Sequence, residues 1–200
     1  MAVKVETAED TGSKFCKVNT ISKEEILDIQ IFGEIPSLDD PDVISLVDTI
    51  ETTRARTIQL TIMSYGGSLD SCMAIYNALK SRRDDTAIIT IANSMLASGA
   101  VFIFMAGHER FIYPYTFVMI HFPTVYEIDG SVGNVNNHMK AIMNLTSEFI
   151  AKEMKATLTE HELETIKAGS DLWLTAKQAL ERKIATRMIG EEQKDERTND

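Results

Sequence analysis

The stretch LASGAVFIFMAG, residues 96–107, places one serine and one glycine at the start of an otherwise apolar segment. A segment of this kind, apolar on every side, is typical of a buried helix. A serine that opens a helix is usually its N-cap. The same position also offers free backbone N–H groups and the positive end of the helix dipole, both of which stabilise developing negative charge. Ser98 is therefore either a cap or a nucleophile.

The chain on both sides of this segment alternates between expected strands and expected helices. One helix is expected to begin at Pro41, with Asp40 as its N-cap and the proline at the first helical position. Another helix is expected over about 68–82. This alternation predicts an α/β fold with a largely parallel sheet and right-handed crossovers. Strands are expected at 26–32, 57–63 and 86–92 and in the segments RFIY, FVMIH and IATRMI.

The alternation is interrupted over residues 122–133, which contain two glycines and no clear helical period. A long amphipathic helix is expected next, from about 131 to 156, and its apolar side suits either the core or an interface between copies. A projecting arm would explain both features. A shorter helix should follow from Thr159, whose capping box includes Glu162, and another should begin at Thr175.

Composition predicts one domain with two polar ends. A chain of 200 residues with 44% hydrophobic content can bury one core of ordinary size. We expect a flexible segment over 1–25, a domain over 26–190 that includes an arm at about 122–156, and a charged tail over 191–200.

Charge and cysteine usage narrow the function classes. The 30 acidic and 20 basic side chains give a formal charge of −10, which argues against a nucleic-acid partner. The two cysteines have no disulfide-like or metal-like spacing, and no stretch resembles a signal peptide or a membrane span. We therefore expect a cytoplasmic protein with no membrane partner.

Four short segments could carry chemistry, because each ends an expected strand or opens an expected helix. A serine hydrolase needs a hydroxyl, an imidazole, a carboxylate and two backbone N–H groups for the oxyanion. Ser98 could be the nucleophile, His121 the base and Asp171 the orienting acid. Each also has a purely structural interpretation: Ser98 as a helix cap, His121 as a structural histidine and Asp171 as an ordinary acidic loop residue. The segments are SYGGS (64–68), LASGA (96–100), MIH (119–121) and SDLW (170–173).

These segments resemble, in order, the proteolytic subunit family of Clp proteases, over about residues 26–190. IMSYGGSLDSCMAIYNAL is similar to the family's INSPGGSV…G.AIYD.M, and LASGAVFIFMAG is similar to AASMGAFLLTAG. RFIYPYTFVMIHFP and SDLWLTAKQALERKI resemble RF.LPNS.VMIHQP and RDYFMTAKEAKEYGI. The resemblance extends to phage-encoded members.

The resemblance implies a serine endopeptidase with Ser98 as nucleophile, His121 as general base and Asp171 as orienting acid. It also implies an oxyanion hole made by the backbone N–H groups of Gly67 and Gly99, the second of which stands where methionine is usual. About two extra residues separate the glycine pair from Ser98, which makes Ser94 a rival nucleophile. No metal or organic cofactor is implied.

The resemblance further implies a ClpP/crotonase-like α/β fold of repeated β-β-α units, with a core of parallel strands and a protruding strand-helix handle. It implies stacked heptameric rings that enclose the active sites, unfolded polypeptide substrates and a Clp-type ATPase unfoldase as partner. Three alternatives remain open. They are a phage capsid-maturation or scaffold protease acting in the host cytoplasm, a crotonase-type acyl-CoA enzyme, and an inactive ring subunit.

Overall fold

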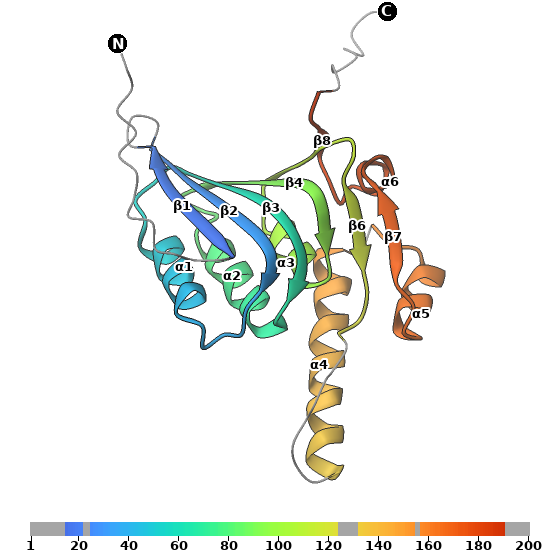
Figure 1. Cartoon of the computed structure of the whole chain (residues 1–200). Helices are drawn as coiled ribbons and strands as arrows, with labels where there is room; N and C mark the ends of the chain where they lie inside the picture. Colours follow the sequence, from blue (N-terminus) through green and yellow to red (C-terminus); the bar gives the residue numbers. More distant parts are fainter. Residues whose placement is uncertain (1–14, 22–24, 124–131, 155–156, 191–200) are drawn as a thin grey trace, which may run out of the picture.

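The computed structural model describes residues 15–21, 25–123, 132–154 and 157–190, and Figure 1 shows their arrangement. The strands are β1 (Cys16–Ile21), β2 (Ile26–Ile35), β3 (Thr57–Gly67), β4 (Ala87–Ala97), β5 (Glu109–Ile112), β6 (Phe117–Ile120), β7 (Leu172–Thr175) and β8 (Arg187–Met188). The helices are α1 (Pro41–Thr52), α2 (Leu69–Ser81), α3 (Gly99–Met105), α4 (Val132–Glu153), α5 (Glu160–Lys167) and α6 (Ala176–Glu181).

All the described strands join one sheet whose centre is parallel. The order is β1-β2-β3-β4-β5-β8. β6 lies off this path: it pairs with the last residues of β4 and, on its other edge, with β7. The pairs β2 with β3, β3 with β4 and β4 with β5 are parallel, whereas β1 with β2 and β6 with β7 are antiparallel. The predicted α/β fold with a parallel core is confirmed.

The core lies between this sheet and the helices α1, α2 and α3, which cover one face of it (Figure 1). Alternate residues of the central strands point into it, because side chains along a strand alternate between its two faces. On β3, for example, Ile58, Leu60 and Ile62 are fully buried. The apolar segment 99–105 forms α3, and all seven of its residues are buried.

The central strands run further than the sequence predicts. β3 continues through the glycine pair to Gly67, and β4 continues to Ala97, directly before Ser98. The pairing of β3 with β4 is irregular near this end: Ile62 lies opposite Ala92, but Ser64, two residues on, lies opposite Leu96, four residues on. This irregularity accommodates the extra residues expected between the glycine pair and Ser98.

The expectation of a flexible segment over residues 1–25 is wrong for its last part, because Cys16–Ile21 forms β1 at the edge of the sheet. Phe15 and Cys16 are buried, but the rest of the strand is largely open. An edge strand that buries only its beginning lacks the alternating pattern on which sequence prediction depends. Residues 1–14 and the predicted tail 191–200 lie outside the described residues.

The long helix α4 is confirmed, and it projects from the body of the molecule in Figure 1. Its last turns are anchored in the core, where the ring of Phe149 lies 5.0 Å from that of Tyr76 and 4.3 Å from that of Phe102. Most side chains of its first half are exposed. The apolar side of α4 is therefore core only near its C-terminal end. Residues 124–131 of the predicted arm lie outside the described residues.

Two predicted helix caps are confirmed. The Asp40 side chain accepts a hydrogen bond from the backbone of Asp42, and Thr159 and Glu162 form the predicted capping box of α5. Glu162 also accepts a 2.7 Å hydrogen bond from Arg182, just beyond α6. This contact fastens α5 to the segment that follows β7. No helix within the described ranges has the length and apolar character needed to cross a membrane.

Candidate active site

Ser98 occupies a tight turn between β4 and α3. Its φ of 54° and ψ of −129° lie in a region that L-residues rarely adopt, and such conformations persist only where the surroundings impose them. Its side chain makes no capping hydrogen bond to α3. The interpretation of Ser98 as a simple helix cap is therefore wrong, and its hydroxyl is available for another partner.

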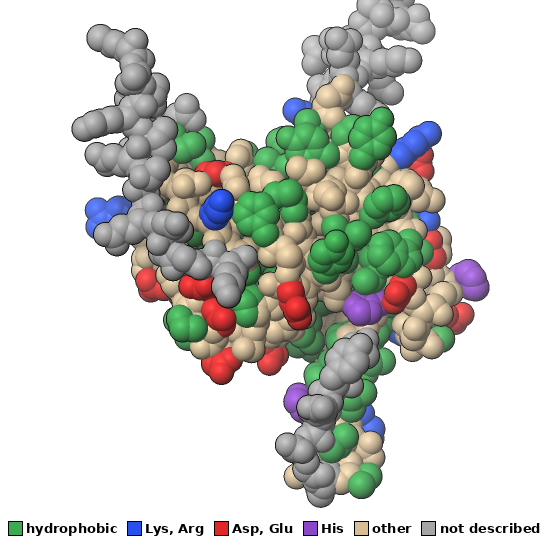
Figure 2. Space-filling view, viewed as in Figure 1, with side chains coloured by type: hydrophobic (Ala, Val, Ile, Leu, Met, Phe, Trp, Pro, Cys, Tyr) green, Lys and Arg blue, Asp and Glu red, His purple; other side chains and the backbone are tan. Residues whose placement is uncertain are grey.

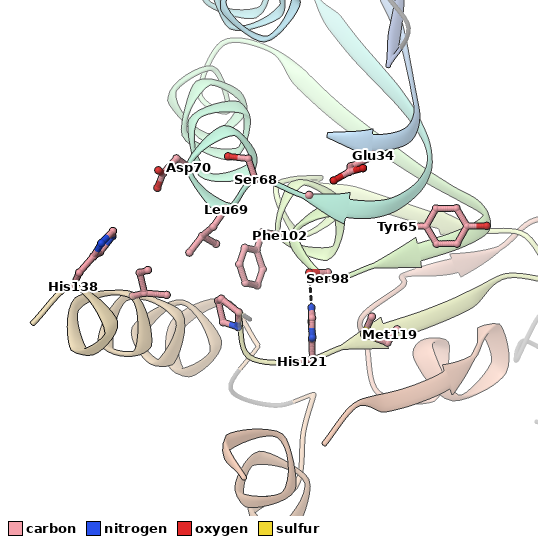
Figure 3. A pocket seen from close by; sticks show the side chains of 14 residues that line it. Glu34, Tyr65, Ser68, Leu69, Asp70, Ser98, Phe102, Met119, His121 and His138 are labelled. Atoms are coloured by element: carbon pink, nitrogen blue, oxygen red, sulfur yellow. Dashed lines mark hydrogen bonds between the residues drawn. The ribbon is translucent and has the colours of Figure 1, made fainter. Parts of the chain in front are cut away.

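That partner is His121. Its Nε2 atom lies 2.7 Å from Ser98 Oγ, the contact drawn as a dashed line in Figure 3. The backbone holds the two residues together, because the N–H of Ser98 donates a 2.9 Å hydrogen bond to the carbonyl of Met119, two residues before His121. A hydroxyl in contact with an imidazole nitrogen is the arrangement that general-base activation of a nucleophile requires.

Asp171 lies on the other side of the imidazole. It directly precedes β7, whose Leu172 pairs with Ile120, so the β6–β7 ladder brings Asp171 beside His121. Asp171 Oδ1 is 3.6 Å from His121 Nδ1, which is longer than a hydrogen bond, and the carboxylate is 47% exposed. All three residues of the predicted triad therefore meet, with one close contact and one looser one.

The glycine pair passes directly beside Ser98. A Cβ added to Gly66 would lie 2.7 Å from Ser98 Cβ and 2.8 Å from the carbonyl oxygen of Ala97. A Cβ on Gly67, whose φ is +147°, would collide with the backbone of Ile35. Only glycine permits this approach. Gly67 and Gly99 both line the cleft that contains Ser98, where the sequence predicts the oxyanion donors.

The cleft around Ser98 and His121 has a volume of about 560 Å³. Figure 3 shows that Leu69 and Phe102 lie on one side of the Ser98–His121 pair, and that Tyr65 and Met119 lie on the other. An extended chain could therefore cross the pair from one side to the other. The lining residues are Glu34, Tyr65, Gly67, Ser68, Leu69, Asp70, Ser98, Gly99, Phe102, Met119, His121, Pro123, His138 and Ile142.

Other nucleophile and base candidates are placed differently. Ser94, the rival of Ser98, is an exposed residue of β4 with a positive φ of 62°, inside the irregular part of that strand. Burial raises the pKa of Cys72 to about 12, so its thiol stays protonated at neutral pH. His108 accepts a 3.0 Å hydrogen bond from the backbone N–H of Ile88 and has a structural role. Among the described residues, no three His, Cys, Asp or Glu side chains form a group that could hold a metal ion.

Sequence reasoning missed much of the cleft wall. Glu34, on β2, and His138 and Ile142, on α4, line the cleft although each is far from the triad residues in the sequence. No local pattern marks these residues, because only the packing of α4 and the end of β2 near Ser98 makes them neighbours.

Comparison with known proteins identifies the family of the chain. The family model described as Clp protease matches residues 13–192. The chain belongs to the Clp protease family. Its similarity to the proteolytic subunit 2 of the ATP-dependent Clp protease of Rhodococcus jostii is 31% identity over 134 residues, covering 64% of this chain and 65% of the relative. The corresponding subunit 2 of Mycolicibacterium paratuberculosis is 35% identical over 133 residues, covering 63% of each chain.

A longer alignment exists with subunit 1 of Chlamydia abortus, at 26% identity over 170 residues, covering 82% of this chain and 88% of that one. A solved structure of a ClpP1 variant from Listeria monocytogenes superposes with a TM-score of 0.63 at 21% identity, covering 80% of this chain and 89% of the other. That likeness confirms the predicted fold. The Clp protease alignments with the Rhodococcus and Mycolicibacterium subunits span slightly less than two thirds of those proteins.

Proposed function

We propose that this Clp protease family chain is a serine endopeptidase in which Ser98, His121 and Asp171 form the catalytic triad. The 2.7 Å contact between Ser98 Oγ and His121 Nε2 carries this proposal. Ser98 has a strained backbone conformation, and its side chain makes no capping hydrogen bond to α3. Both features lower the stability of the folded chain, and a purely structural serine would need neither. Both are explained if its hydroxyl has to face the imidazole.

In the proposed mechanism, Ser98 Oγ attacks the carbonyl carbon of the scissile peptide bond while His121 Nε2 takes the hydroxyl proton. The carbonyl oxygen becomes an oxyanion, which the backbone N–H groups of Gly67 and Gly99 would stabilise. When the C–N bond breaks, His121 gives its proton to the leaving amine and an acyl group remains on Ser98. Water, deprotonated by His121, then hydrolyses this ester and restores the serine.

Asp171 would orient the imidazole and stabilise its charged form during both steps. Its 3.6 Å separation from His121 Nδ1 has to shorten for a hydrogen bond to form. Catalytic hydrogen bonds are often long in ligand-free enzymes and tighten when substrate binds. We propose that substrate binding or assembly brings about this change.

The assembly and partners are part of the same proposal. Several relatives are named as proteolytic subunits of ATP-dependent Clp proteases. By analogy, copies of this chain would form stacked rings of seven subunits that enclose the active sites. A Clp-type ATPase in the cytoplasm would deliver unfolded polypeptides to them. The largely exposed first half of α4 is a surface through which such rings could join.

Labelling with a fluorophosphonate, which reacts with activated serines, tests the proposal directly. We expect wild type and Ser94→Ala to take up one label, which peptide mapping finds on Ser98, and Ser98→Ala to take up none. Ser94→Ala is a suitable control because Ser94 is a nearby, exposed serine that also has a positive φ. Label on Ser94 would overturn the assignment. An unlabelled wild-type protein would instead support an inactive subunit or an acyl-CoA enzyme.

A further inference from the structure

Large apolar side chains are exposed on the sheet beside the candidate active site. Tyr65 is 67% exposed, Phe117 54% and Trp173 52%. Together with Met119 we call these residues the aromatic strip. Figure 2 shows hydrophobic side chains gathered on this face of the molecule, in the region of β6 and β7. Contiguous exposed apolar surface on a soluble protein usually marks a site of binding.

The strip is continuous with His121. Side chains of β6 alternate, so that Val118 and Ile120 enter the core while Phe117 and Met119 face outward, on the side from which His121 reaches Ser98. Trp173 on β7 pairs directly with Met119, which places the two side chains next to each other on that outer face. Phe117 pairs in turn with Met95 of β4.

The strip reaches the cleft through two of its residues, which form one arm of it. Tyr65 and Met119 line the same cavity as Ser98 and His121. In Figure 3 both lie across the Ser98–His121 pair from Leu69 and Phe102. The opposite arm is continuous with the proposed oxyanion donors, since Leu69 follows Gly67 by two residues and Phe102 follows Gly99 by one helical turn.

The chemistry assigns a different part of the substrate to each arm. During acyl transfer the carbonyl carbon stays bonded to Ser98 with its oxygen at Gly67 and Gly99, and the acyl part of the substrate extends away from the leaving amine. The arm of Leu69 and Phe102 could receive this acyl part. The leaving amine receives its proton from His121 and therefore departs past His121. The chain attached to that amine would lie along the outer face of β6.

We propose that the aromatic strip binds apolar side chains of the substrate on the carboxyl side of the scissile bond and makes cleavage selective for them. This inference rests on the proposed serine peptidase function. Aromatic and Met side chains bury a large apolar area and adapt to different partners, as an unfolded polypeptide requires. A strip of this kind would favour apolar residues such as Leu or Phe after the cleaved bond over Ser or Asp.

Binding can be measured without turnover, because Trp173 is the only tryptophan of the chain. In the Ser98→Ala protein, an unstructured decapeptide with Leu at alternate positions should shift Trp173 emission to shorter wavelength with a saturable dose dependence. The same peptide with Ser at those positions should not. Phe117→Ser should weaken the binding of the Leu peptide, whereas Tyr115→Ser should not, because Tyr115 is 94% exposed and lies outside the strip.

Two results of this experiment would overturn the proposal. The first is that neither peptide changes the emission. The second is that the emission changes with protein concentration and the Leu peptide has no effect, which would show that a second copy of the chain covers the strip. Both results are independent of catalysis, so they bear on the strip even if Ser98 proves not to be a nucleophile.

The second part of the test measures peptide cleavage by the active enzyme. Two internally quenched peptides would share every residue before the cleaved bond and differ by Leu or Ser at the two positions after it. We expect kcat/KM to be roughly tenfold higher for the Leu peptide in wild type, the scale on which an apolar subsite discriminates. Phe117→Ser should remove that difference, whereas Tyr115→Ser should preserve it and leave hydrolysis of a methyl ester with the same acyl sequence unchanged.

Equal cleavage of the two peptides by wild type would overturn the proposed selectivity. Absence of cleavage and of ester hydrolysis would refute the peptidase function instead, and the fluorescence experiment would then decide whether the strip binds apolar peptides. The two failures are therefore distinguishable.

Discussion

The Sγ atom of Cys72, on α2, occupies the space that a side chain at position 99 would need: a Cβ added to Gly99 would lie 2.5 Å from it. Cys72 is fully buried, so it has little room to move away. The close approach of α2 to the start of α3 therefore depends on a matched pair, a small thiol on one helix and no side chain on the other. Ser98 directly precedes Gly99, so the packing of this pair lies next to the candidate nucleophile.

Gly99→Ala should destabilise the protein by about 1–3 kcal/mol, the usual cost of overpacking a core. In a Cys72→Ala background the same substitution should cost much less, because the obstructing sulfur is gone. Urea denaturation of the four proteins measures this as a coupling free energy, with about 0.5–3 kcal/mol expected for residues in contact. Additive effects of the two substitutions would show that the contact does not limit the packing of α3.

Gly66→Ala should impair the site beyond its cost in backbone strain. Gly66 and Gly169 share a φ of +91°, but a Cβ on Gly169 would meet nothing within 4 Å, whereas one on Gly66 would meet Ser98. Gly169→Ala thus reports strain alone, about 1–3 kcal/mol in a denaturation experiment. Only Gly66→Ala should slow fluorophosphonate labelling of Ser98, on the order of 10²-fold, as expected for a misplaced reactive group. Equal labelling rates for the two variants would contradict this.

Asp171→Asn should lower kcat by about 10²–10⁴-fold while KM changes little, because the amide preserves the shape of the carboxylate but cannot stabilise a charged imidazole in the transition state. Steady-state hydrolysis of a fluorogenic peptide measures both constants. Glu181→Gln, which removes an exposed acid on α6, is the control and should leave both unchanged. Unchanged kcat in Asp171→Asn would remove Asp171 from the proposed triad.

Glu162 should make folding stability depend on acid pH. Burial alone would raise the pKa of Glu162, but hydrogen bonds from the Thr159 backbone and from Arg182 outweigh it and hold the pKa below its usual 4.5. A carboxyl group whose pKa is lowered on folding stabilises the folded state above its unfolded pKa, and that contribution is lost as pH falls through the lower folded value. Glu162→Gln should therefore cost about 1–3 kcal/mol at pH 7, the range for hydrogen bonds to charged groups.

The cost of Glu162→Gln should persist down to about pH 4.5 and shrink below it as the wild-type carboxyl group becomes protonated. Urea denaturation across this pH range, with Glu164→Gln as an exposed control on the same helix, follows the difference. A cost that stays constant to pH 2 would mean that Glu162 contributes through its shape and not through its charge.

The elements that could be predicted are those whose signals are local. Asp40 with Pro41 identifies the start of α1, Thr159 with Glu162 identifies α5, and the central strands are recognisable from their apolar segments. β1 could not be predicted in this way, because its stability comes from pairing with β2 and not from its own pattern. The continuation of β3 through the glycine pair could not be predicted either, because it depends on the close approach of the strand to Ile35 and Ser98, which are distant in the sequence.

The sequence by itself determined which chemical groups stand at the ends of which strands, because capping, apolar periodicity and the order of residues are properties of neighbours along the chain. The tertiary structure decided which of these groups meet. It places Ser98 against His121 and Asp171 Oδ1 at 3.6 Å from His121 Nδ1. It also brings residues of α4 and of the aromatic strip to the same cleft. Such distances depend on how the sheet and helices pack, which no local stretch of sequence encodes.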